Sequence, residues 1–205
     1  MVTYLIIGIT SLISVLCFNN RELFGKLLFN ANAVFINRSQ WYRLFTHGLV
    51  HADFPHLILN MFVLYSFGTL LEGYDFRALF GHQAPFVFGL LYVTALPAST
   101  LYSYYKHKHN YAYNAVGASG AVSAIVFSSI LISPLNTLLV IVFPMKAFIF
   151  GALYLAYSWY MGKKATDNVG HDAHFWGAVY GIVFTAGLKP VLLMNFIYQL
   201  QSMFQ

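Results

Sequence analysis

Long apolar segments, separated by shorter polar stretches, make up most of the sequence. A helix needs about 20 predominantly apolar residues to cross the hydrocarbon core of a bilayer. The pattern therefore predicts an all-α, polytopic membrane protein, with residues 1–205 forming a single membrane domain. The six predicted spans are residues 2–18, 56–71, 85–105, 115–132, 145–161 and 171–188.

Three further segments do not fit the pattern of spans. Residues 19–55 form a long connection dotted with aromatic side chains, so we expect this first loop to lie in the membrane–water interface. Residues 135–143 are apolar, but nine residues reach only about 13 Å as a helix, so we expect a re-entrant or interfacial piece. Residues 190–205 are predicted to form a short interfacial helix.

The first predicted span has two interpretations, a signal peptide or a retained helix. No basic residue precedes the apolar stretch, and no small-residue cleavage site follows it. Asn19, Asn20 and Arg21 come next instead. We therefore expect this segment to be retained as the first transmembrane helix.

The composition agrees with a membrane protein. Hydrophobic residues make up 59% of the chain and charged residues only 8%, whereas a soluble domain carries roughly a quarter charged residues. The net charge of +5 is spread without a block of like charges, which argues against a nucleic-acid partner and is compatible with a bilayer that contains anionic lipid. Cys17 is the single cysteine, so it cannot form an intrachain disulfide.

The charged residues also bear on orientation. Six spans would put both termini on one side of the membrane. Loops on the side of the 19–55 connection hold most of the basic residues, and the positive-inside rule then places that connection in the cytoplasm. These residues are Arg21, Lys26, Arg38, Arg43, Lys106, Lys108, Lys163 and Lys164, against Arg77, Lys146 and Lys189 on the opposite side.

Ser119 is the first candidate for chemistry. It lies at the start of the fourth span, in the segment Gly117-Ala118-Ser119-Gly120, where glycines leave room for a substrate to approach. The segment is not the G-x-S-x-G elbow of α/β hydrolases, because position 121 is alanine. Serine in a membrane helix is usually a packing residue, so Ser119 alone is weak evidence for a nucleophile.

His174 strengthens the case for Ser119. It lies near the start of the sixth span, where a structural histidine bonded to a carbonyl is the alternative interpretation. Gly177 and Gly181 form a face that permits close helix contact, and Gly120 with Ala124 offers a matching face on the fourth span. If these faces meet, Ser119 and His174 lie at similar depth across the contact.

His56 and Asn60 are spaced i, i+4 on one face of the second span. Both side chains can donate hydrogen bonds, which a developing oxyanion requires together with backbone N–H groups near the nucleophile. A structural interhelical hydrogen-bond pair is the alternative interpretation.

Two other roles for polar residues remain open. The spacing of His47, His51 and His56, and of His171 and His174, suits zinc or copper ligands, although no carboxylate or cysteine accompanies them within a span. Asp172 is a candidate third triad member. However, it precedes His174 by two positions, and residues at i and i+2 on a helix do not face each other. We therefore expect a Ser–His dyad with no metal and no cofactor.

Taken together, these motifs resemble the rhomboid family of intramembrane serine proteases over about residues 41–188. They occur in the family's order on the second, fourth and sixth spans. The matching segments are His56 with Asn60, preceded by Phe45-Thr46-His47 and His51; Gly117-Ala118-Ser119-Gly120; and Ala173-His174 with Gly177 and Gly181.

The resemblance implies a six-transmembrane-helix rhomboid bundle with a long interfacial first loop. It implies that Ser119 is the nucleophile, at the head of a shortened central helix in a water-filled cavity, and that His174 is the base. It assigns His56 and Asn60, with Ser119, to oxyanion stabilisation, and Glu72 to the acidic position that closes the second span. It also places the first loop outside the cytoplasm, against the charge count.

The sequence departs from the family at two places. The first loop reads Trp41-Tyr42-Arg43, where adjacent Trp-Arg is common. Ser123 stands where well-studied bacterial members carry a tyrosine stacked on the catalytic histidine. Trp176, Tyr180 or another aromatic must therefore hold His174.

The predicted function is hydrolysis of peptide bonds in or near transmembrane helices of membrane-protein substrates, by a multi-pass protein of the cell membrane. A catalytically inactive rhomboid-like protein that binds transmembrane helices is the alternative. A metal transporter is a third possibility, but it would be expected to carry carboxylates or paired histidines on several spans.

Overall fold

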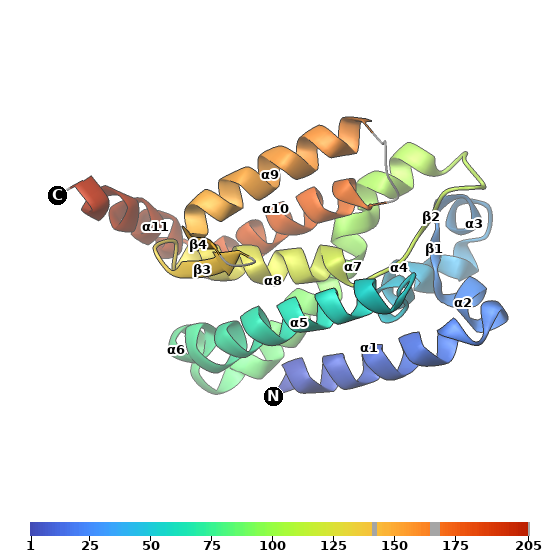
Figure 1. Cartoon of the computed structure of the whole chain (residues 1–205), viewed down its shortest axis with the longest axis horizontal. Coiled ribbons are helices and arrows are strands. Elements are labelled where there is room, and N and C mark those ends of the chain that lie inside the picture. Colours follow the sequence, from blue (N-terminus) through green and yellow to red (C-terminus); the bar gives the residue numbers. More distant parts are fainter. Residues whose placement is uncertain (141–142, 165–168, 205) are drawn as a thin grey trace.

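The computed structural model describes residues 1–140, 143–164 and 169–204. The chain is mostly helical, at 81%. Each predicted span corresponds to one long helix (Figure 1). These helices are α1 (Val2–Phe18), α5 (Phe54–Leu70), α7 (Ala84–His107), α8 (Ser119–Ile132), α9 (Ala147–Lys164) and α10 (His171–Leu188).

Helix α8 lies at the centre of the bundle. All its residues from 120 to 131 are buried, which is expected of a helix that is apolar on every side. Figure 1 shows α8 between α5 on one side and α9 and α10 on the other. Its first residue, Ser119, therefore sits at one end of the best-enclosed helix of the fold.

The number of membrane crossings stays a prediction. Within the described part of the chain, only the helical run Phe54–His107, which contains α5 and α7, is long and apolar enough to pass as a spanning segment. Helix α10 qualifies only together with α11 (Val191–Gln201), from which it is bent by 111°. Helices α1 and α8 are apolar but shorter; the 14 residues of α8 rise only about 21 Å, less than the ~30 Å hydrocarbon core.

The prediction of an all-α chain missed two small antiparallel sheets. Strand β1 (Phe29–Asn30) pairs with β2 (Asn114–Ala115), and β3 (Thr137–Val140) pairs with β4 (Phe143–Lys146). The apolar piece at residues 135–143, expected to be re-entrant or interfacial, thus contributes β3 and the first residue of β4, with residues 141–142 outside the described part. Its β-branched Thr137 and Val140 favour an extended backbone.

The long first loop is a folded unit. It contains α2 (Arg21–Leu27), α3 (Ala31–Ile36), α4 (Arg43–Thr46) and two 3₁₀ turns, Arg38–Tyr42 and His47–Leu49. The Arg43 guanidinium donates to the carbonyl oxygens of Gly25 and Leu28, which ties α4 to the last turn of α2 and to the residue that follows it. A buried cluster of Phe29, Ala31 and Val34 packs against Leu44, Tyr104, Tyr113 and Ala115, so the loop rests on α7 and on the segment that leads into α8.

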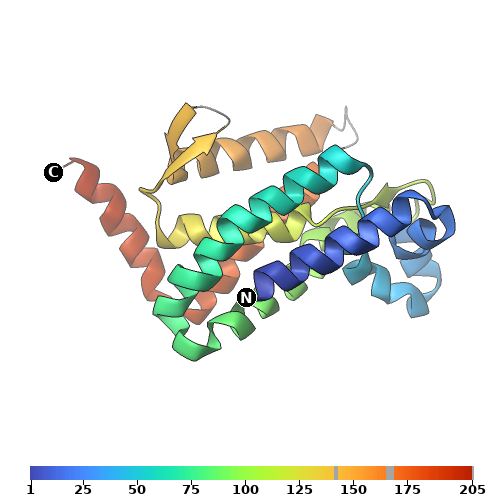
Figure 2. The same ribbon diagram turned by 60° about the horizontal axis from the view of Figure 1, so that its bottom comes forward.

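Two further regions lie at the end of the bundle where α5 and α10 finish (Figure 1). A π-helical turn (Leu71–Asp75), α6 (Phe76–Phe80) and a 3₁₀ turn (Gly81–Gln83) connect α5 to α7. Helix α11 follows α10 after Pro190 and turns away from it (Figure 2). It is followed by a 3₁₀ turn, Ser202–Phe204. The segment expected to be a short interfacial helix is therefore helical over most of its length and exposes several apolar side chains: Val191, Leu193, Met194, Ile197 and Tyr198.

Candidate active site

A tight turn leads the chain into Ser119. Gly117 has φ of +107°, a conformation that residues with a Cβ rarely adopt. A Cβ on Gly117 would also lie 2.7 Å from Cε1 and 2.8 Å from Nε2 of His56, so the imidazole rests directly on this turn. Ser119 is the first residue of α8, and the first intrahelical bond runs from the Val122 N–H to the Ala118 carbonyl oxygen. The backbone N–H groups of the first turn, and the positive end of the helix dipole, therefore lie beside Ser119.

His51 also holds this turn, beside His56, a role the sequence did not predict. Its buried ring accepts from the Ala118 N–H at Nε2 (3.4 Å), and its Nδ1 lies 2.9 Å from Ser14 Oγ. The Ser14 hydroxyl donates its single proton to the Leu49 carbonyl oxygen, so His51 Nδ1 carries a hydrogen and donates to Ser14. His51 is thus a neutral structural histidine in this arrangement.

Burial keeps the loop histidines neutral. Burial, with smaller contributions from the neighbouring rings of His56 and His47, lowers the pKa of His51 to about 3. Burial also lowers the pKa of His47 to about 4. The backbone of His47 completes the support of the turn, because its carbonyl oxygen accepts from the Gly117 N–H (2.9 Å).

Helix α10 carries His174 in its first turn, where the His174 N–H donates to the Gly170 carbonyl oxygen (3.0 Å). The backbones of α8 and α10 touch through their small residues. A Cβ on Gly177 would overlap the Gly120 carbonyl oxygen, and a Cβ on Gly181 would overlap that of Ala124. At the same contact, a Cβ on Gly120 would lie 3.3 Å from the carbonyl oxygen of Ala173, the residue before His174.

This contact brings the two candidate catalytic segments together. Ser119 directly precedes Gly120 on α8, and His174 directly follows Ala173 on α10. The approach requires glycine at position 177, since a side chain there would overlap the backbone of α8. Gly120 also packs against Ser99 of α7, so three helices meet at this point.

The ring that faces His174 comes from α9. The centroid of Tyr154 lies 6.2 Å from that of His174, with the two rings tilted by 28°. Of the two supports named from the sequence, Trp176 packs against Tyr102 of α7, and the Tyr180 hydroxyl donates to Thr94 Oγ1. Tyr154, which was not named from the sequence, is thus an aromatic of α9 in contact with His174.

His56 and Asn60 lie one helical turn apart at the start of α5. Asp53 caps this helix, since its Oδ1 accepts from the His56 N–H (2.8 Å). Asn60 is buried, and its Nδ2 donates to the His56 carbonyl oxygen (2.9 Å). An amide nitrogen has two hydrogens, so Asn60 retains a second donor. The His56 ring, which rests on Gly117, is thus the closer of the two to the turn before Ser119.

Asp172, the candidate third triad member, forms an ion pair with Lys106. Its Oδ2 accepts from Lys106 Nζ (2.8 Å), which ties the start of α10 to the end of α7. Across the residues that the structure describes, no group of three histidine, cysteine or acidic side chains is arranged to hold a metal ion.

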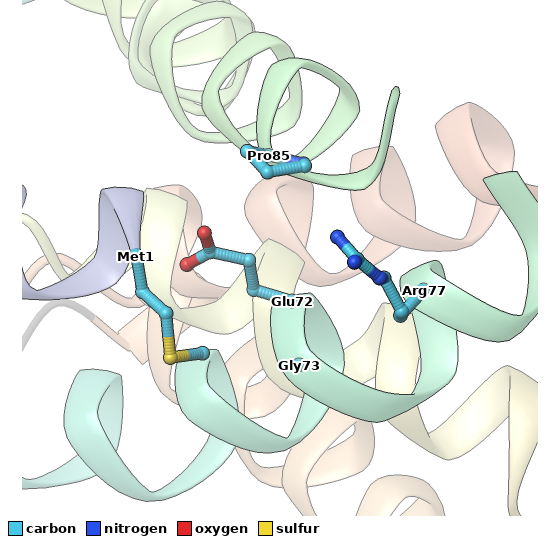
Figure 3. Close-up of a pocket in the computed structure, with 5 residues that line it drawn as sticks. All are labelled: Met1, Glu72, Gly73, Arg77 and Pro85. Carbon is cyan, nitrogen blue, oxygen red and sulfur yellow. The ribbon is translucent and has the colours of Figure 1, made fainter. Parts of the chain in front are cut away.

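Glu72 lies in the π-helical turn just beyond α5, about 24 Å along the helix axis from His56. Its carboxylate accepts from the backbone N–H groups of Val2 and Thr3 and from the Thr3 hydroxyl, at 2.7–2.9 Å. Glu72 therefore caps α1 instead of contributing to the Ser119 site. Figure 3 shows it between Met1 and Arg77 in a pocket that Gly73 and Pro85 complete.

Most of the chain matches the model of a known protein family. The family model of the Rhomboid domain matches residues 38–190, which include every residue of the site described above except Ser14. No curated protein matches the chain.

Proposed function

The chain belongs to the rhomboid family, whose members are embedded in membranes and are generally intramembrane serine proteases, and from this premise we propose that it is an active protease. It would hydrolyse peptide bonds in or near transmembrane helices of membrane-protein substrates. Ser119 would be the nucleophile and His174 the general base.

One observation carries the proposal. The backbone of α8 at Gly120 touches the backbone of α10 at Gly177 and approaches Ala173. Ser119 and His174 are the chain neighbours of Gly120 and Ala173, and each lies in the first turn of its helix. A nucleophile and a base from helices in backbone contact form the pairing that serine acyl transfer requires.

The reaction would proceed in two stages. His174 takes the proton of the Ser119 hydroxyl while Oγ attacks the scissile carbonyl carbon, and then gives that proton to the leaving amine. The tetrahedral intermediate loses the amine and becomes an acyl-enzyme. Water then attacks the ester with His174 again as base, which releases the carboxylate product and restores the serine. These steps use no metal and no organic cofactor.

The oxyanion would form beside the turn at Gly117. The Ser119 N–H lies in the unpaired first turn of α8, where the helix dipole favours negative charge. The His56 ring rests on Gly117, and Asn60 keeps a second amide hydrogen. We assign these three donors to the oxyanion, because donors fixed before the reaction stabilise the transition state without reorganisation.

The proposed active site would lie in the interior of a bilayer. We propose that the six long helices all cross the membrane, that the aromatic first loop lies in the interface outside the cytoplasm, and that the protein resides in the cell membrane. Polar side chains and water at such depth are tolerated in a cavity lined by protein. A substrate helix would unwind locally to enter beside α8, with small residues at the cut to fit the glycine-flanked serine.

The test uses purified protein in detergent with a model single-span substrate. We expect cleavage by the wild type and none by Ser119→Ala or His174→Ala, with all three showing the same thermal unfolding. Cleavage retained by either variant would contradict the assignment of Ser119 and His174 as a catalytic dyad. A wild type that binds the substrate without cutting it would support the inactive binding protein. Cleavage lost on adding a chelator would favour a metal site.

A further inference from the structure

The side chain of Tyr154 links the two halves of the proposed dyad. Its ring lies 6.2 Å from the His174 ring at a tilt of 28°, which is within the range of stabilising aromatic contacts. Its hydroxyl lies 2.6 Å from Ser123 Oγ. Ser123 is one turn beyond Ser119 on α8, and its hydroxyl donates to the Ser119 carbonyl oxygen (2.8 Å).

The hydrogen-bond directions follow from the proton count. Ser123 has one hydroxyl proton, and the bond to the Ser119 carbonyl uses it. The Tyr154 hydroxyl must therefore donate to Ser123 Oγ. The chain of contacts then runs from the backbone of Ser119, through Ser123 and Tyr154, to the face of His174.

A second ring in contact with His174 meets it in a different geometry. The His171 ring stands 6.0 Å away at 78°, so it meets His174 edge to face. His171 in turn packs edge-on against Tyr157. Tyr154 alone among these combines a nearly parallel ring with a hydrogen bond to the helix that carries Ser119.

Tyr154 stands on a peripheral helix. Helix α9 lies at the edge of the bundle (Figure 1) and fully buries only Ala147, Gly151 and Ser158. Gly151 sets its approach to α8, since a Cβ there would lie 3.3 Å from Ile130 and 3.4 Å from Phe127. Tyr154 follows Gly151 by three positions, so it shares the face that docks on α8.

We propose that Tyr154 is the positioning residue of the dyad: its ring holds the His174 imidazole, and its bond to Ser123 ties that ring to the nucleophile helix. The inference rests on the proposed function. It means that the docking of α9, a helix that carries neither Ser119 nor His174, sets the orientation of the general base. A small misplacement of a base lowers the rate of the chemical step without weakening substrate binding.

The test compares two substitutions that both remove the hydroxyl. Tyr154→Phe keeps the ring, whereas Tyr154→Leu keeps apolar volume in the same cluster but removes the ring. We expect Tyr154→Leu to lower kcat by about 10–100-fold with KM within about twofold of the wild type. We expect Tyr154→Phe to stay within about fivefold of the wild-type kcat, as the loss of one hydrogen bond implies.

Leu155→Ala is the matched control. Leu155 is a partly buried neighbour of Tyr154 on the same helix and in the same hydrophobic cluster. We expect its truncation to weaken the docking of α9 while the Tyr154 ring stays in place. We expect it to lower the unfolding temperature at least as much as Tyr154→Leu while keeping kcat within about threefold of the wild type. A further variant, Ser123→Ala, leaves the partly buried Tyr154 hydroxyl without this partner, and adding Tyr154→Phe should recover part of the loss in kcat that Ser123→Ala causes.

The outcomes separate this inference from the proposed function. Wild-type cleavage that does not depend on Ser119 would overturn the proposed function and the inference with it. With Ser119-dependent cleavage established, a Tyr154→Leu protein with wild-type kcat would overturn the inference alone. So would a Leu155→Ala protein that loses kcat as severely as Tyr154→Leu, because the effect would then come from the packing of α9.

Discussion

The carbonyl oxygen of Gly120 occupies the space that a side chain on Gly177 would need. The two residues come from α8 and α10, and their contact lies next to Ser119 and close to His174. The approach of the proposed catalytic pair therefore depends on a backbone contact that leaves no room for a methyl group.

Gly177→Ala should separate the two helices. The added Cβ overlaps backbone and not a movable side chain, so we expect a loss of about 1–3 kcal/mol in the free energy of unfolding and a strong loss of cleavage. Gly187→Ala is the control on the same helix, because no described atom lies within 4 Å of its Cβ position. Thermal unfolding in detergent checks both variants. Equal unfolding temperatures and equal cleavage for the two would contradict the tight contact.

Gly117→Ala should damage the turn before Ser119 for two reasons. The positive φ alone costs a residue with a Cβ about 1–2 kcal/mol, and the new methyl group would press on the His56 ring. Gly81→Ala has the first penalty without the second, since its φ is +57° and its Cβ position is open among the described residues. We expect both to lower stability in an unfolding assay but only Gly117→Ala to abolish cleavage. Full activity in Gly117→Ala would argue against the turn as part of the site.

Asp172→Asn should leave catalysis nearly intact. Asp172 pairs with Lys106, and a partly exposed ion pair of this kind contributes up to about 1 kcal/mol. A triad carboxylate would instead be worth about 10⁴-fold in kcat. We expect kcat within about fivefold of the wild type in a steady-state cleavage assay. A loss of several orders of magnitude would make Asp172 a third catalytic member.

Acidification should unfold the site through its buried loop histidines. The pKa of His47 is lowered to about 4 and that of His51 to about 3, both by burial, so the folded state binds fewer protons than the unfolded state below pH 6.5. Stability is therefore complete above pH 6.5 and falls as the pH drops toward these values, by about 1.4 kcal/mol per pH unit for each histidine.

Unfolding followed between pH 7.5 and pH 5 checks this expectation. We predict that His51→Gln reduces the slope of stability against pH by about half, whatever its effect on stability at pH 7.5. A wild-type stability that does not change over this range would mean that neither ring is kept neutral by burial.

Local patterns in the sequence were sufficient to predict the long helices. The apolar run at residues 2–18 coincides with α1, because apolar character along one stretch of chain decides both membrane affinity and helix length. The fourth span was predicted from residue 115, whereas α8 begins at Ser119. The apolar residues before it form β2 and the Gly117 turn, and hydrophobicity carries no information about φ.

Contacts between distant segments were harder to predict. The β1–β2 pairing joins Phe29 to Ala115, and a two-residue strand has no pattern of its own. The small-residue faces of α8 and α10 were visible because their spacing repeats along each helix. The contact of Tyr154 with His174 was not visible in the sequence, because one tyrosine among several on α9 is distinguished only by which neighbour it meets.

Labelling with a fluorophosphonate tests the central claim most directly, because the reagent reacts with a serine that a base has activated. We predict that the wild type forms one adduct, located on Ser119 by mass spectrometry, and that Ser119→Ala and His174→Ala proteins of unchanged unfolding temperature form none. An adduct on a different serine, or undiminished labelling of Ser119 in the His174→Ala protein, would contradict the account.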